Sequence, residues 1–158
     1  MTDLAARLVA ICKDQGLTIA TAESCTGGLI AAAITAIPGS SAVLDRGFVT
    51  YSNAAKTDLL GIPPQLIAAN GAVSKPVAQA MATGAKTRAG TSLAVSVTGI
   101  AGPDGGSPEK PVGTVWFGLA ARRGRISTHH QLFSGDRAAI RAASVTFALN
   151  LLLGATEP

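Results

Sequence analysis

The sequence predicts an α/β fold: a three-layer α/β/α sandwich with a mixed sheet of about five strands and helices on both faces. Short apolar runs typical of buried strands alternate with segments of helical periodicity. Near the C-terminus, two strand-like runs are joined at Arg123-Gly124, which indicates a β-hairpin and makes part of the sheet antiparallel. With 158 residues, 47% of them hydrophobic, the chain fits one domain over residues 1–158 that needs no disulfide or structural metal for its core.

The boundaries of the elements follow from glycine, proline and capping residues. Gly16, Gly61 and Gly90 follow helical patterns directly, where a left-handed residue ends a helix. Ser52 and Asp136 precede such patterns, where a side-chain oxygen can cap the first turn. In chain order we expect helices over 2–15, which begins at a Thr2 cap, and over 29–37, 53–60 and 75–88, with a helical turn at Pro63-Pro64 and a last helix that runs to about Leu153. We expect strands over 17–21, 46–51, 93–97, 112–121 and 126–133. No core element is expected over 98–111, which is rich in Gly and Pro.

Composition excludes several classes of protein. The formal charge is only +4 and the aromatic residues are one Trp, one Tyr and four Phe, so a basic groove with stacking platforms for nucleic acid is not expected. The most apolar stretch, Leu29 to Ile37, is about half the length of a membrane-spanning helix, so we expect no membrane segment. Two cysteines and the lack of a secretory layout at the N-terminus predict a reducing, cytoplasmic location.

Familiar catalytic motifs are also missing. The chain has no P-loop, no dinucleotide-binding Gly-x-Gly-x-x-Gly, no Gly-x-Ser-x-Gly and no His-Glu-x-x-His. His129 and His130 are adjacent on a predicted strand, so they point to opposite faces and cannot jointly bind one metal ion. We therefore expect neither a metal site nor a cofactor.

The segment Thr21-Ala-Glu-Ser-Cys-Thr-Gly-Gly28 is the strongest candidate site. It places hydroxyl groups and a thiol between the end of a strand and the start of a helix, where unpaired N–H groups can hold an anion or an oxyanion. Simple capping would explain one hydroxyl, but not three beside a pair of glycines. A Ser24 nucleophile needs a base, and Lys56, near the start of the helix after Ser52, is the candidate, since the helix end and burial would lower its pKa.

Five segments together resemble the CinA C-terminal domain family, in order and over nearly the whole chain. They are Ala22-Glu-Ser-Cys-Thr-Gly-Gly28, Arg46-Gly-Phe-Val-Thr-Tyr-Ser-Asn53 with Lys56, Gly71-Ala-Val-Ser74, Thr98-Gly-Ile-Ala-Gly-Pro-Asp-Gly-Gly106 and Lys110-Pro-Val-Gly-Thr-Val-Trp116. The resemblance implies a CinA-like fold and a stand-alone nicotinamide-nucleotide amidase, which converts nicotinamide mononucleotide (NMN) and water to nicotinate mononucleotide and ammonia in pyridine nucleotide recycling.

The resemblance also implies roles for individual residues. Ser24 would be the nucleophile, with Lys56 and Tyr51 as its proton-transfer partners, and the partner molecule would be a pyridine mononucleotide. We further hypothesise an oxyanion hole from the N–H groups around Cys25 to Gly27, and a phosphate contact from a basic residue such as Arg137. The expected substrate-binding residues are Glu23, Cys25, Thr26, Gly27, Gly28, Thr98, Gly99, Gly102 and Arg137.

Two alternatives stay open at this point. Cys25 could be the nucleophile, because thiolates at helix starts are activated. The domain could instead be a non-catalytic module that binds a nucleotide or a partner in competence or DNA damage. Its Ala-rich helices are compatible with a homo-oligomer, a dimer or larger.

Overall fold

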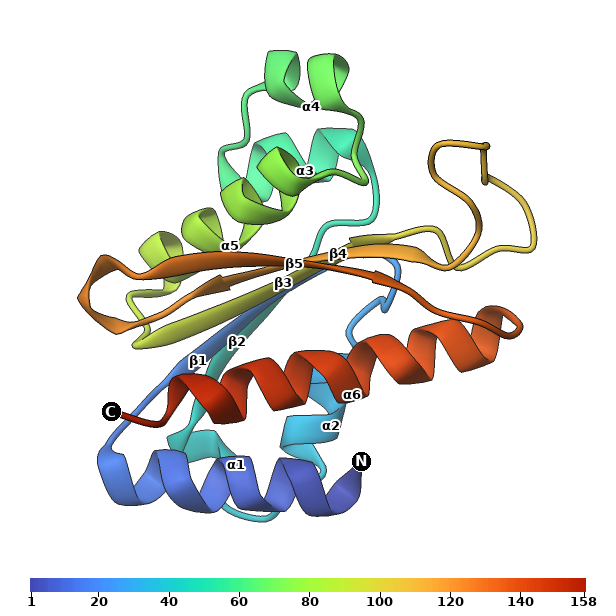
Figure 1. The fold of residues 1–158 in the computed structure, drawn as a ribbon. Helices are drawn as coiled ribbons and strands as arrows, with labels where there is room; N and C mark the ends of the chain where they lie inside the picture. The colour runs from blue at the N-terminus through green and yellow to red at the C-terminus, as the bar shows by residue number, and fades with distance from the viewer.

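A five-stranded mixed sheet forms the middle layer of the computed structural model, which describes all 158 residues (Figure 1). The strand order is β2-β1-β3-β4-β5. β1 is parallel to both β2 and β3, whereas β4 and β5 form an antiparallel hairpin next to β3. The strands are β1 (Ile19–Glu23), β2 (Leu44–Val49), β3 (Leu93–Gly99), β4 (Thr114–Ala120) and β5 (Ile126–Leu132). The predicted fold class is confirmed.

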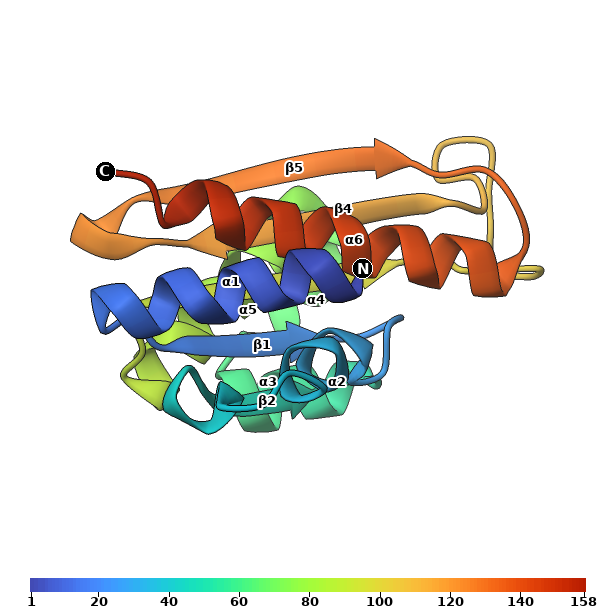
Figure 2. The ribbon, with the colours of Figure 1, turned by 90° about the horizontal axis from the view of Figure 1, so that it is seen from below.

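Helices cover both faces of this sheet. One face carries α1 (Thr2–Gln15), α2 (Leu29–Thr35) and α6 (Arg137–Ala155). The other carries α3 (Asn53–Leu60), α4 (Pro64–Asn70) and α5 (Lys75–Ala89). Seen from below, α1 and α6 lie side by side, while β2 and β5 form the two edges of the sheet (Figure 2). Apolar side chains fill the space on each face, in a larger cluster beneath α1, α2 and α6 and a smaller one beneath α5.

Several element ends follow the capping residues of the sequence. Gly16, Gly61 and Gly90 end α1, α3 and α5 in the left-handed conformation. Ser52 accepts the N–H of Ala55 at the start of α3, and Asp136 accepts the N–H of Ala139 at the start of α6. These ends were predicted, because a cap is a local interaction between residues close in sequence.

Other boundaries differ from the expectation. Thr2 is no cap: the residue before α1 is Met1, and no side chain caps that helix. β1 begins at Ile19 rather than Leu17, because the N–H of Leu17 donates to Cys12 O at the end of α1, and Thr18 is hydrogen-bonded to Ser92. β1 also ends later than expected, at Glu23, and this last residue belongs to the site described below.

α6 is a second apolar segment, which the sequence analysis did not consider as a possible membrane span. It has 19 residues and is the one helix whose length and composition would suffice to cross a membrane. In the structure it packs against β3, β4, α1 and α2, with Ile140, Val145, Leu149 and Leu152 buried. That is the place of a core helix.

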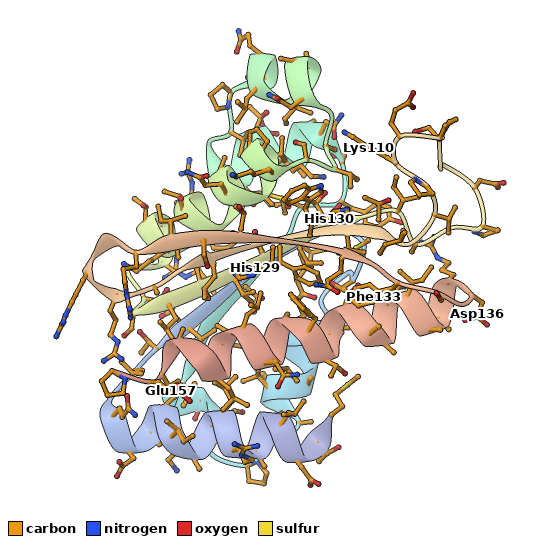
Figure 3. The ribbon with its side chains drawn as sticks, in the orientation of Figure 1. Lys110, His129, His130, Phe133, Asp136 and Glu157 are labelled. Atoms are coloured by element: carbon orange, nitrogen blue, oxygen red, sulfur yellow. The ribbon has the colours of Figure 1, made fainter.

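The two histidines face opposite sides of edge strand β5, as predicted. His129 lies toward α6, with its ring 6.2 Å from that of Phe147, and His130 lies on the other side against Trp116, at 4.9 Å (Figure 3). His129 is half-buried, and its Nε2 atom is hydrogen-bonded to Ser127 Oγ at 3.0 Å, whereas His130 is exposed.

Candidate active site

The candidate site lies where the carboxyl ends of β1 and β2 meet. Glu23, the last residue of β1, is paired with Val49, the last residue of β2, so Ser24 and Thr50 leave the sheet side by side. After these strands the chain turns to opposite faces, into α2 behind β1 and into α3 behind β2 (Figure 1). In open α/β sheets, a ligand site usually lies beyond the carboxyl ends of strands whose following helices diverge in this way.

Lys56 and Ser24 are in direct contact just beyond these strand ends. The Nζ atom of Lys56 lies 3.2 Å from Ser24 Oγ, and it also donates to the carbonyl oxygens of Thr50 (3.0 Å) and Tyr51 (3.3 Å). Lys56 is 1% exposed and Ser24 is 9% exposed. The structure thus brings together the serine and the lysine that the sequence singled out, 32 residues apart.

The surroundings of Lys56 favour its neutral amine. Burial lowers the pKa of Lys56 below its usual 10.5, and the nearby Cys25 offsets this only in part. No carboxylate pairs with Lys56, since the one ion pair in the structure joins Arg46 to Asp45. A neutral amine has two N–H groups, which match the two carbonyl oxygens, and one lone pair, which is then free to accept the proton of Ser24.

Glu23 supports the turn that carries Ser24. Its carboxylate is 1% exposed and accepts from Thr26 Oγ1 (2.7 Å) and from the N–H groups of Ile30 (2.9 Å) and Ala31 (3.1 Å) at the start of α2. These N–H groups have no partner within the helix, so the carboxylate takes the place of a cap. Glu23, expected among the substrate-binding residues, is therefore a buried residue whose two carboxylate oxygens accept hydrogen bonds from the protein itself.

The turn after Ser24 offers two free backbone donors. The N–H of Gly27 donates to the carbonyl oxygen of Ser24 (3.0 Å), which excludes it from the oxyanion hole expected over Cys25 to Gly27. Neither the N–H of Cys25 nor that of Thr26 donates to another residue, although the Cys25 N–H lies against the thiol of its own side chain. Gly27 and Gly28 have φ of 57° and 104°, values that favour glycine, which explains the glycine pair behind the serine.

The thiol of Cys25 is not activated. Burial raises the pKa of the Cys25 thiol to about 11, and the backbone N–H of Cys25, Arg141 and Arg137 lower it only in part. The start of a helix was expected to lower the pKa of this thiol, but desolvation outweighs that effect here. At neutral pH the side chain beside Ser24 is a buried thiol, which does not suit a nucleophile.

Tyr51 and Arg137 form the outer part of the site. The Tyr51 ring is 61% exposed, and its hydroxyl accepts from Arg137 Nη2 at 3.1 Å rather than contacting Ser24 or Lys56. Arg137, the first residue of α6, also donates from Nη1 to the carbonyl oxygen of Gly102 at 2.8 Å. The guanidinium therefore joins the Tyr51 segment to the loop behind β3.

The loop behind β3 is fixed mainly by contacts within the protein. Thr98 Oγ1 donates to Ala72 O (2.9 Å), and the Thr98 side chain is 1% exposed. A Cβ at Gly99 would meet the side chain of Val115 at 2.7 Å, and one at Gly102 would meet Val112 at 2.5 Å. These three residues, expected to bind substrate, have clear structural roles in the loop.

Lys110 anchors the far end of that loop. Its Nζ donates to the carbonyl oxygen of Asn70 at 3.0 Å, and Figure 3 shows the side chain extending from the loop toward the α3–α4 side of the sheet. The loop is thus held at one end by Arg137 and at the other by Lys110.

The sequence analysis missed Arg141. This residue lies one turn after Arg137 on α6 and donates from Nε to Cys25 O (3.1 Å) and from Nη2 to Thr26 O (3.3 Å). The spacing of four residues, which puts two arginines on one helix face, was the signal that could have indicated it.

Comparison with known proteins decides the family. A family model described as the CinA C-terminal domain matches residues 1–156. The chain belongs to the CinA C-terminal domain family. The chain is similar to the nicotinamide-nucleotide amidohydrolase PncC of Enterobacter agglomerans, at 56% identity over 151 residues, covering 96% of this chain and 92% of the relative. It is 55% identical to the Escherichia coli K12 protein of the same name, covering 89% and 85%.

Other members of the CinA family are longer, and several have solved structures. The CinA-like protein of Geobacter sp. M21 is 57% identical over 92% of this chain, which corresponds to 35% of that relative. The competence/damage inducible protein CihA of Agrobacterium tumefaciens superposes with a TM-score of 0.97 at 49% identity, covering 99% of this chain and 95% of that one. A CinA superfamily protein from Klebsiella pneumoniae superposes with a TM-score of 0.93 at 39% identity, covering 98% and 96%.

Proposed function

We propose that this chain is a nicotinamide-nucleotide amidohydrolase, which hydrolyses the carboxamide of NMN to nicotinate mononucleotide and ammonia. The observation that carries the proposal is the contact of Ser24 with a buried Lys56 that has no carboxylate partner. Relatives with this activity in their names are 55–56% identical over most of both chains. A serine beside a lysine whose pKa is lowered by burial is one arrangement that activates a nucleophile for acyl transfer.

In the first half of the reaction, Ser24 Oγ attacks the carboxamide carbon while Lys56 Nζ takes the hydroxyl proton. The carbonyl oxygen becomes an oxyanion, which the free N–H groups of Cys25 and Thr26 are available to bind. The Lys56 ammonium then gives its proton to the amide nitrogen, the carbon–nitrogen bond breaks, and ammonia leaves. The product of this half is an ester between Ser24 and the nicotinoyl nucleotide.

In the second half, water replaces ammonia. Lys56, neutral again, takes a proton from the water molecule as its oxygen attacks the ester carbon. Collapse of the second tetrahedral intermediate returns the proton to Ser24 Oγ and releases nicotinate mononucleotide. No step requires a metal ion or a cofactor.

We assign Tyr51 and Arg137 to the substrate rather than to the proton path. The Tyr51 hydroxyl contacts Arg137 instead of the Ser24–Lys56 pair, which does not favour the relay role first considered for it. Its exposed ring offers an aromatic surface for the pyridine, and the Arg137 guanidinium, with no carboxylate partner, is suited to the phosphate. A cytoplasmic location and a homo-oligomer stay predictions.

The test is product formation from a set of carboxamides. Purified, folded protein is incubated with NMN, nicotinamide riboside and nicotinamide, and both ammonia and the carboxylic acid product are quantified. We expect equal amounts of ammonia and nicotinate mononucleotide from NMN, and much slower turnover of the two compounds without phosphate. Saturable binding of NMN with no ammonia would instead support the non-catalytic module, which the competence/damage names of structural relatives keep as the alternative.

A further inference from the structure

Arg141 holds the turn that carries both free N–H groups of the site. It comes from α6, 116 residues after the turn, and its two hydrogen bonds go to consecutive carbonyl groups, those of Cys25 and Thr26. The guanidinium also lies close to Gly27, where an added Cβ would be 3.6 Å from Nη2. The half-buried side chain thus contacts the first two residues after Ser24 and lies beside the third.

The peptide geometry connects these carbonyl groups to the oxyanion hole. The carbonyl of Cys25 and the N–H of Thr26 belong to one peptide unit, so a cation on the oxygen polarises the N–H on the other side. The carbonyl of Thr26 and the N–H of Gly27 belong to the next unit, and that N–H donates to the carbonyl of Ser24. One guanidinium therefore acts on the donor of the oxyanion hole and on the hydrogen bond that closes the turn.

The charge of Arg141 is not used elsewhere. It has no carboxylate partner, because the structure contains one ion pair, between Arg46 and Asp45. Its field reaches the turn, since it lowers the pKa of the Cys25 thiol against the larger effect of burial. A planar fork with several N–H donors can bind two carbonyl groups at once, which the single ammonium of lysine does less well.

We propose that Arg141 is a positioning residue for the amidase reaction: its hydrogen bonds to the carbonyl groups of Cys25 and Thr26 orient and polarise the Thr26 N–H toward the oxyanion. The inference rests on the proposed function, because it gives that reaction a further residue. It predicts an effect on kcat, where the oxyanion forms, and little effect on KM, because Arg141 donates to carbonyl groups of the protein itself.

The experiment compares Arg141→Met and Arg141→Lys with Arg7→Met, an exposed arginine on α1. Complete loss of one oxyanion donor lowers kcat by roughly 100- to 1000-fold, so a misplaced and less polarised donor is expected to cost about 10- to 100-fold in Arg141→Met. Arg141→Lys keeps the charge and is expected to recover only part of kcat. Arg7→Met is expected to match the unmodified protein.

A second readout separates this inference from the proposed function. A fluorophosphonate probe reacts with an activated serine through an oxyanion-like transition state and needs no NMN. If the unmodified protein leaves NMN intact but the probe labels it at Ser24, and if the probe labels Arg141→Met more slowly, the proposed substrate is wrong and the role of Arg141 stands. If kcat and the labelling rate per folded molecule are unchanged in Arg141→Met, or if only KM changes, the proposed role of Arg141 is wrong. If Arg141→Met does not fold, the same criteria are applied to Arg141→Lys.

Discussion

Removing the Glu23 carboxylate is expected to destabilise the protein and loosen the nucleophile turn. In Glu23→Ala, the buried N–H groups of Ile30 and Ala31 and the hydroxyl of Thr26 all lose their acceptor. A buried donor without a partner costs about 1–3 kcal/mol, so the two N–H groups alone give a loss of about 2–6 kcal/mol in the free energy of unfolding. For a chain of this length, roughly 2–4 °C in Tm corresponds to each kcal/mol, and we expect Tm to fall by about 10 °C.

Glu23→Gln refines this test because it preserves the volume of the side chain. One amide oxygen still accepts, but the amide nitrogen now faces a donor, so one of the three hydrogen bonds is lost and the expected cost is about 1–2 kcal/mol. Thermal and denaturant unfolding, followed by circular dichroism, measure both variants. Glu109→Ala, an exposed residue in the loop behind β3, is the control. A Tm for Glu23→Ala equal to that of Glu109→Ala would refute the reasoning.

Three further substitutions test the buried lysine and the close packing of α5. Lys56→Met keeps most of the buried volume, and it should abolish ammonia release yet raise stability at neutral pH. Between the lowered pKa of Lys56 in the folded protein and 10.5, the unfolded chain binds more protons than the folded chain. The stability of the unmodified protein should therefore rise with pH in that window, and that of the variant should not. The acidic limb of kcat/KM in the unmodified protein should likewise follow a pKa below 10.5. Retained turnover in Lys56→Met, with the same acidic limb, would contradict the assignment. Gly84→Ala on α5 places a Cβ against the carbonyl oxygen of Leu60, so it should lower Tm, whereas Gly154→Ala near the end of α6, with open space around it, should raise stability by about 0.5–1 kcal/mol. Equal shifts for the two glycines in thermal unfolding would argue against the close contact of α5 with α3.

The sequence predicts those parts of the fold that depend on neighbours in the chain. Ser52 and Asp136 cap their helices as expected, and the hairpin over β4 and β5 follows from its turn. The boundary of β1 could not be predicted, because it depends on where α1 uses the N–H of Leu17 and on a hydrogen bond between Thr18 and Ser92, 74 residues away.

The same distinction applies to the site. Ser24 and Lys56 could be singled out because each stands at a strand end or helix start with a recognisable local pattern, and parallel strands bring such ends together. The roles of Glu23 and Arg141 could not. Glu23 is buried and hydrogen-bonded to the start of α2, and the contacts of Arg141 span 116 residues. The raised pKa of Cys25 was also out of reach, because desolvation depends on burial that only the folded chain has.

The nucleophile is tested most directly by ammonia release from NMN in Ser24→Ala and Cys25→Ala, at equal concentrations of folded protein. The structure places Lys56 against Ser24 Oγ and leaves Cys25 as a protonated thiol, so Ser24→Ala should lose turnover while Cys25→Ala keeps most of it. Turnover near the unmodified rate in Ser24→Ala, together with its loss in Cys25→Ala, would contradict a serine mechanism and assign the reaction to the cysteine.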